Sequence, residues 1–235
     1  MRRIIALALL GCMLLAASAL AEDVPEGDAF MLEQSAMLTV RMRHIAESGA
    51  VTLMTSMPEI LTAIDEISGY TVDLPVRALV YQLDAELMAD AMLRGVGLSP
   101  KQRMDEELRA WASRRMAAVI PSMLAGNAGS TALATASILS VGEGYVRPEA
   151  FDRDAVVVLY YEDVPYVSII TFSRNGEDTI GASAMFVPQS DALEELLTDD
   201  LSSLFEGLFT VYEGVITRTE YDAESLEALL VPAGE

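Results

Sequence analysis

The spacing of apolar residues predicts a long amphipathic helix near the start of the chain. This helix is expected to begin after Asp28 and to end at Glu47. Apolar residues that recur every three or four positions lie on one face of a helix. Here that face is formed by Met31, Leu38, Met42 and Ile45.

Capping patterns predict three more helices. Ser56 and Glu59 form a capping box, in which a serine hydroxyl and a glutamate three residues later satisfy free backbone amides. Ser99 and Gln102 repeat the pattern. The helix after them is expected to turn Met104, Leu108 and Trp111 inward. Between these two, a helix capped by Asp73 is predicted to bury Val76, Val80, Leu83, Leu87 and Ala91.

No residue between Met116 and Val141 is charged. Pro121 and the segment 126–129 interrupt this stretch, so two short buried helices are predicted rather than one membrane span. The second is expected at the centre of the fold, because small residues allow helices to pack closely. These small residues are Ala132, Ala134 and Ala136.

The pattern changes to that of strands in the second half. Segments 155–161, 166–173 and 179–187 are rich in β-branched and aromatic residues, and the Asn175-Gly176 pair between the last two favours a tight turn. These three strands are predicted to form an antiparallel meander. Ser190 is expected to cap a helix with Leu193, Leu197, Leu201, Leu204 and Leu208 on one face. A strand at 215–221 and a last short helix capped by Asp222 are predicted to follow.

These patterns predict an α+β fold, with a helical N-terminal half packed with a three-stranded antiparallel meander and C-terminal helices. The expected organisation is a signal peptide at 1–21, a mainly helical region at 22–142, and antiparallel strands with a C-terminal helix at 143–235. The last two regions are expected to form one globular unit.

The first 21 residues have the pattern of a secretory signal peptide. Arg2 and Arg3 precede an apolar run, which ends in Ala19-Leu20-Ala21. We therefore expect cleavage after Ala21 and a secreted or periplasmic protein. A leader kept as a membrane anchor and a lipoprotein lipidated at Cys12 are the alternatives.

Charge and cysteine content narrow the function classes. The chain has 36 acidic and 15 basic residues, a net charge of −21, and losing the two leader arginines makes it −23. Such a chain repels nucleic acid and anionic lipid, so neither is an expected partner, and no stable membrane span is expected after cleavage. Cys12, the one cysteine, leaves with the leader, which removes disulfide and thiolate chemistry from the mature chain.

Few residues suit catalysis. His44 and Lys101 are the only residues of their types, and both are expected to have ordinary surface roles. No cofactor is expected. Acidic pairs such as Glu194-Glu195 and Asp199-Asp200 lie opposite apolar helix faces, which indicates solvated surfaces, although two carboxylates in a pocket would make a hydrolase the alternative function.

Two groups of residues are candidate binding sites. Glu149, Asp152 and Asp154 bring together oxygen ligands of the kind that calcium accepts, without the EF-hand spacing. The segment 101–115 is basic in an acidic chain and carries Arg109, Arg114 and Arg115. Either these arginines pair with acidic helices of the same fold, the outcome that we expect, or they dock an anionic partner. The function predicted from the sequence is a non-enzymatic binding or interaction module for an extracytoplasmic protein or small ligand.

The leader supplies the first testable prediction. Protein collected outside the cells of the native host should have an intact mass that corresponds to a chain starting at Glu22, because Ala19-Leu20-Ala21 forms the cleavage signal. A chain that keeps Met1, or one that begins at a lipidated Cys12, would contradict this prediction.

Overall fold

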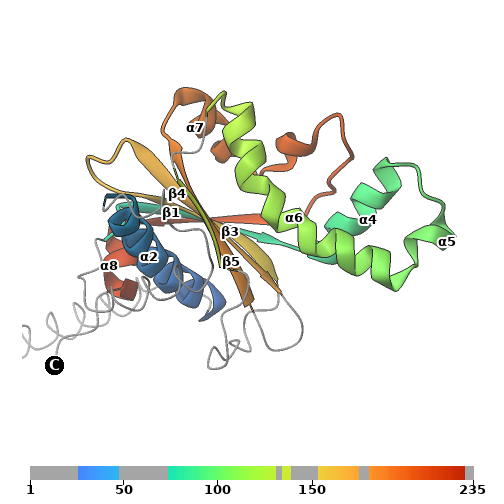
Figure 1. Cartoon of the computed structure of the whole chain (residues 1–235), viewed down its shortest axis with the longest axis horizontal. Coiled ribbons are helices and arrows are strands. Elements are labelled where there is room, and N and C mark those ends of the chain that lie inside the picture. Colours follow the sequence, from blue (N-terminus) through green and yellow to red (C-terminus); the bar gives the residue numbers. More distant parts are fainter. Residues whose placement is uncertain (1–25, 48–73, 131–133, 139–152, 175–179, 231–235) are drawn as a thin grey trace, which may run out of the picture.

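The computed structural model describes residues 26–47, 74–130, 134–138, 153–174 and 180–230 (Figure 1). Its helices are α2 (Glu26–Glu47), α4 (Ala85–Gly95), α5 (Pro100–Arg103), α6 (Glu106–Asn127), α7 (Asp191–Thr198) and α8 (Ala223–Leu230), with a short 3-10 helix η2 (Ser202–Phe205). Its strands are β1 (Arg77–Leu83), β2 (Ala134–Ile138), β3 (Asp154–Tyr160), β4 (Tyr166–Arg174), β5 (Ile180–Pro188) and β6 (Ile216–Asp222).

Within these ranges, six strands form one antiparallel sheet in the order β2-β5-β4-β3-β1-β6. Strands β3, β4 and β5 follow one another in the chain and lie side by side in the sheet. The first strand, β1, lies between β3 and the last strand, β6. The three predicted strands are therefore adjacent and antiparallel, as expected. They form half of a larger sheet, so the expectation of a three-stranded sheet was wrong.

Helices cover both faces of the sheet (Figure 1). On one face α4, α6 and α7 pack over the side chains of alternate residues, such as Leu79 and Tyr81 of β1. On the other face α2 and α8 pack over the residues between them, such as Ala78 and Val80. Successive side chains of a strand point to opposite faces, so each central strand contributes to two cores.

Central strands buried on both faces read as continuous apolar runs. All seven residues of β3 are buried, including Asp154 at its start. This arrangement explains why β1 was mistaken for part of a helix. The apolar residues of its segment happen to recur at helical spacing, and tertiary packing on both sides of the sheet overrides that local pattern.

Two further helix predictions were wrong. The second predicted helix of the uncharged stretch is the strand β2, so the region 22–142 contains two strands, β1 and β2, besides its helices. The first is part of a single helix, α6, which continues through Pro121 to Asn127. Proline removes one helical hydrogen bond, and burial of Ile120 and Leu124 on either side of Pro121 stabilises the continued helix.

The inward face of α6 also differs from the prediction. The buried residues of this helix include Ala112, Met116, Ile120 and Leu124, whereas Met104 just before it and Trp111 within it are exposed. Beyond Ser190, the predicted leucine helix ends at Thr198, and Leu201 adopts a left-handed conformation with φ of 64° before η2. Leucines 193, 197, 201 and 204 are nevertheless buried as predicted, and Leu208 is exposed.

Several local predictions are confirmed. Ser190 accepts a hydrogen bond from the Leu193 amide and caps α7, and Asp222 accepts one from the Ser225 amide at the start of α8. The α+β class and the strand at 215–221, observed as β6, are confirmed as well. The capping box at Ser56 and the Asn175-Gly176 turn lie outside the described residues.

Polar contacts fix the position of α2 on the sheet. Asp28 is completely buried and accepts hydrogen bonds from the Tyr221 hydroxyl (2.6 Å) and the Gln82 amide (2.5 Å). Further along α2, the hydroxyl of Thr39 lies 2.7 Å from the hydroxyl of Ser168 in β4. Apolar packing tolerates sliding, whereas these directional bonds specify one register for the helix.

None of the described helices is long and apolar enough to cross a membrane.

The buried carboxylate gives a prediction about stability. Replacing Asp28 with Ala should lower the free energy of unfolding by about 1–3 kcal/mol, because Gln82 and Tyr221 would lose their acceptor. Glu33→Ala, an exposed position of the same helix, is the matched control and should change stability by less than about 0.5 kcal/mol. Chemical denaturation measures both, and equal effects of the two variants would contradict the role given to Asp28.

Candidate functional site

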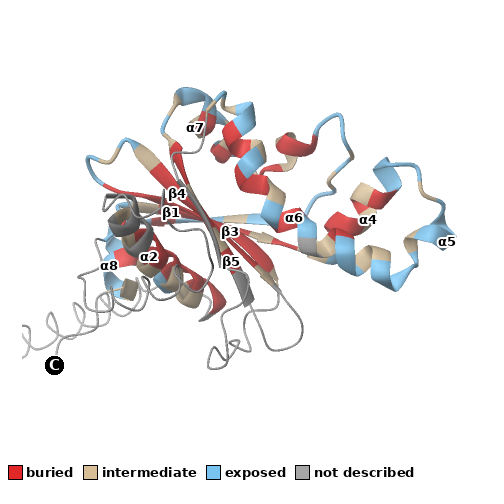
Figure 2. Ribbon diagram, viewed as in Figure 1, coloured by how far each residue is buried: buried red, intermediate tan, exposed pale blue. Residues whose placement is uncertain are grey.

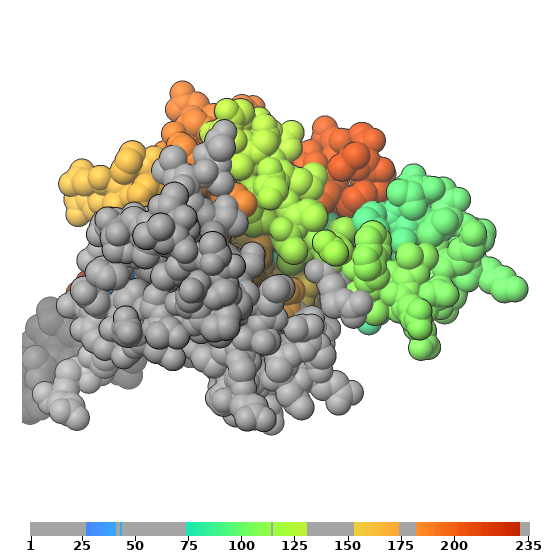
Figure 3. All heavy atoms as spheres, in the orientation of Figure 1, coloured from blue at the N-terminus to red at the C-terminus, as the bar shows by residue number. Residues whose placement is uncertain are grey.

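One end of the molecule projects beyond the sheet and is formed by α4, α5 and the first half of α6 (Figures 1 and 3). We call residues 85–115 together with the adjoining segment 206–214 the helical end. Its small core consists of Ala89, Leu93 and Ala112. Three caps begin its helices: Asp84 bonds the Leu87 amide, Asp105 bonds the Leu108 amide, and Gln102 bonds the Ser99 amide. The Ser99–Gln102 capping box is thereby confirmed.

Ion pairs tie the helices of this end together. Asp90 of α4 accepts hydrogen bonds from Arg94 (2.7 Å) and from Arg103 (2.8 Å), and Arg103 is largely buried. Arg109 of α6 pairs with Glu86 of α4 at 3.2 Å. The exposed pairs contribute little to stability, while the shared Asp90 holds α5 against α4.

The three arginines predicted as a binding site therefore have different positions. Arg109 is held by an acidic residue of the same fold. Arg115 is exposed on α6, and the side chain of Arg114 lies outside the described residues. Lys101 is exposed, as the sequence suggested.

Large exposed hydrophobic side chains are concentrated at the helical end. The described residues include eight such side chains, and six of them are here: Leu87, Val96, Met104, Trp111, Leu208 and Tyr212. In Figure 2, the ribbon around α5 is coloured mainly as exposed. Met104 is 69% exposed and Trp111 is 48% exposed. Single exposed apolar residues are ordinary, but their concentration at one end makes the helical end the candidate surface for binding.

The segment 206–214 is anchored to α4 by close contacts. Gly95, the last residue of α4, lies so near the segment that an added Cβ would be 2.6 Å from Cβ of Phe209 and 2.8 Å from the Leu208 carbonyl oxygen. Arg94 also donates a hydrogen bond to the Tyr212 hydroxyl at 3.0 Å. The α4 helix therefore determines where the exposed Leu208 and Tyr212 side chains lie.

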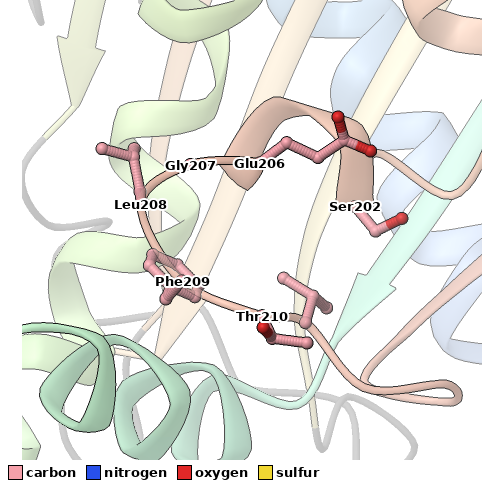
Figure 4. A pocket seen from close by; sticks show the side chains of 7 residues that line it. Ser202, Glu206, Gly207, Leu208, Phe209 and Thr210 are labelled. Carbon is pink, nitrogen blue, oxygen red and sulfur yellow. The ribbon is translucent and has the colours of Figure 1, made fainter.

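An open hollow of about 430 Å³ lies within this segment (Figure 4). It is lined by Ser202, Glu206, Gly207, Leu208, Phe209, Thr210 and Val211. Glu206 is the one carboxylate of its lining, so the hollow does not provide the two facing acids of a glycosidase.

A second polar cluster joins α7 to the sheet. Glu220 of β6 pairs with Arg77 and with Arg218, each at 2.7 Å, and Arg77 also reaches Glu194 of α7 at 3.2 Å. Desolvation would raise the pKa of Glu220, but the hydrogen bonds from the two arginines outweigh it and lower that pKa below its usual range. These charges are compensated, and the cluster acts as a brace.

Two tyrosines lie beneath this brace. The buried Tyr81 hydroxyl donates a hydrogen bond to the Leu197 carbonyl oxygen at 2.6 Å, and desolvation raises its pKa to about 12. Desolvation also raises the pKa of Tyr160, whose ring lies under the Arg77 guanidinium. Both phenols therefore keep their protons to a higher pH than an exposed tyrosine would.

The calcium candidates are only partly described. Asp154 is the buried first residue of β3, and Glu149 and Asp152 lie outside the described residues. In the described ranges, no three His, Cys, Asp or Glu side chains are grouped as metal ligands would be. The backbone of His44 belongs to α2, and nothing is described of its side chain.

Several acids from the clusters that were expected to be solvated helix faces have structural roles. Asp105 caps α6, Glu194 pairs with Arg77, and Asp200 accepts a hydrogen bond from the Ser202 amide. Sequence reasoning missed the contribution of segment 206–214, because it placed Leu208 in the helix that starts at Ser190. The signal was available in Gly207 and Gly214, which both adopt positive φ angles that interrupt regular structure.

The contact at Gly95 gives a prediction with a matched control. Gly95→Ala should lower the melting temperature by several degrees, because its Cβ collides with backbone of the neighbouring segment. Gly126→Ala, which also lies in a helix but has open space around it, should leave the melting temperature unchanged or raise it slightly. If the two variants unfolded alike, the segment would not be anchored at Gly95.

Tyr81 gives a prediction of pH dependence. The unfolded chain releases this phenolic proton near pH 10 and the folded chain near pH 12, so the folded state binds more protons in this interval and stability falls as pH rises. Tyr81→Phe should be less stable at neutral pH but should lose less stability between pH 10 and 12. Denaturation at several pH values measures this difference, and equal slopes would contradict it.

Comparison with known proteins gives no assignment to a family. No family model matches the sequence, and no curated protein or solved structure matches the chain. Function therefore has to be argued from the surface chemistry described above.

Proposed function

We propose that this chain is an extracytoplasmic, non-enzymatic binding module that recognises a protein partner through its helical end. The observation that carries the proposal is the concentration of exposed apolar side chains there, with Trp111 and Met104 on or beside α6. Protein interfaces are enriched in Trp, Met and Arg, and a buried Trp is a frequent source of binding energy.

Charge supports the same surface. The helical end carries six basic and seven acidic side chains and is therefore nearly neutral, whereas the whole chain has a net charge of −21. At long range, an acidic partner is therefore repelled less by the helical end than by the rest of the molecule. The field of the chain therefore favours approach in one orientation.

Rigidity supports it as well. The pairs of Asp90 with Arg94 and Arg103 hold the short helix α5, and Gly95 holds the adjoining segment. These contacts therefore hold the backbone segments that carry Met104 and Tyr212. A surface that is already ordered loses little conformational entropy when it binds.

A carboxylate-based hydrolase is the alternative function. It would require two carboxylates that face each other across a pocket. The hollow beside Glu206 offers one, and several other candidate acids serve as caps or ion-pair partners. The location outside the cytoplasm is part of the same proposal, and it rests on the leader at residues 1–21.

The proposal is tested by substitution at the helical end. Wild-type protein immobilised as bait should retain a partner from the extracytoplasmic fraction of the native host, and Trp111→Asp should reduce its recovery at least about tenfold. Leu74→Asp is the matched control, because Leu74 is also exposed and apolar but lies before β1, away from the helical end. Its recovery of partner should equal that of wild type.

Trp111 also provides an independent readout, because it is the only tryptophan of the chain. Binding of the purified partner should move its fluorescence to shorter wavelength and protect it from acrylamide, since contact removes water from the indole. Recovery that survives Trp111→Asp, or fluorescence unchanged at saturation, would contradict a docking surface at the helical end.

A further inference from the structure

The strand β6 has a side on which no other described strand pairs. It lies at the end of the sheet order and pairs with β1 in an uninterrupted register from Ile216 to Asp222. Its sequence, ITRTEYD, contains no proline or lysine, the residues with which natural sheets often block an edge. Thr217, Thr219 and Glu220 are exposed.

The register shows which backbone groups of β6 face outward. The Asp84 amide donates to the Val215 carbonyl at 2.9 Å, and hydrogen-bonded pairs alternate along an antiparallel ladder. Thr217, Thr219 and Tyr221 therefore direct their backbone groups toward β1. Ile216, Arg218 and Glu220 direct their N–H and C=O groups to the outer side.

Outward residues can pair only with outward residues of an added strand. A second β6 strand in antiparallel orientation can therefore be placed in three registers that keep the middle of both strands paired. These registers differ in which residue of the second strand lies opposite Arg218. If Arg218 lies opposite itself, two cations face each other. If Glu220 lies opposite itself, two anions do. In the remaining register, Arg218 of each copy lies opposite Glu220 of the other.

We propose that β6 pairs with β6 of a second copy of this chain in that third register, with Thr219 on the two-fold axis. The sheet then continues across the pair of molecules as a single antiparallel sheet. Two symmetric pairs of opposite charges then form across the joint, each between Arg218 of one copy and Glu220 of the other. The other two registers would be destabilised, because like charges lie opposite each other in them. This self-recognition is separate from the helical end and does not depend on its proposed partner.

The side chains of β6 are compatible with this arrangement. Arg218 and Glu220 point to the face that carries Arg77, so each Glu220 would lie between Arg77 of its own chain and Arg218 of the second copy. On the opposite face, the exposed Thr217 and Thr219 would pass over the joint. About four backbone hydrogen bonds would form at Arg218 and Glu220, which is characteristic of a small and reversible interface.

The register can be tested with single thiols. In a Cys12→Ser background, Thr219→Cys introduces the only thiol of the chain. The two copies of residue 219 would face each other as a non-hydrogen-bonded pair with Cα atoms about 4.5 Å apart, which a disulfide can bridge. Oxidised glutathione supplies the oxidant: the two thiols lose two electrons and two protons to it and form one disulfide.

Thr217→Cys is the matched control. It is exposed on the same face of the same strand, but its counterpart would lie four residues along the strand, about 14 Å away. Thr219→Cys should therefore give at least about tenfold more covalent dimer on non-reducing gels than Thr217→Cys. Equal yields from the two positions, or no dimer from either, would overturn the proposal.

Sedimentation of the chain without introduced thiols gives an independent measurement. Its mean mass should rise with protein concentration from that of one chain toward that of two. Arg218→Glu should weaken this association at least about tenfold, because it opposes two carboxylates across the joint. A mass that stays at one chain throughout would overturn the proposal as well, and thermal unfolding establishes that the variant is folded.

Discussion

Burial of β1 and β3 on both faces is the constraint on which the rest of this structure depends. An antiparallel sheet can leave one face in water, but here every residue of β3 is buried. The sheet therefore needs two layers of helices, with α6 and its neighbours on one side and α2 with α8 on the other. Much of the chain serves to cover this pair of strands.

The same constraint decides what the sequence could predict. Strands β3 to β6 were found because turn residues separate them and β-branched residues fill them. In contrast, β1 is followed directly by Asp84, the cap of α4, so no turn separates strand from helix. Its apolar residues then fitted a helical spacing that continued into α4. Local periodicity does not distinguish a strand buried on both faces from a buried helix.

The candidate surface was only partly predictable, for a similar reason. The capping residue Ser99 located the start of α5, because a cap is a local interaction. The caps Asp84 of α4 and Asp105 of α6 were not recognised, so the break between α5 and α6 was missed. The orientation of α6 depends on its packing against β4, which is remote in sequence, and so Trp111 was placed on the wrong side. The arginines of this region were recognised as unusual, but which of them pair with α4 follows only from the tertiary structure.

The contact between Asp28 and Tyr221 has a consequence for the order of assembly. The two residues are 193 positions apart, and they join the first described helix to the last strand. During synthesis α2 emerges from the ribosome early, but its anchoring partner is among the last residues to appear. The last polar contact that anchors α2 can therefore form only when nearly the whole chain has been made, after the contact of Thr39 with Ser168 has become possible.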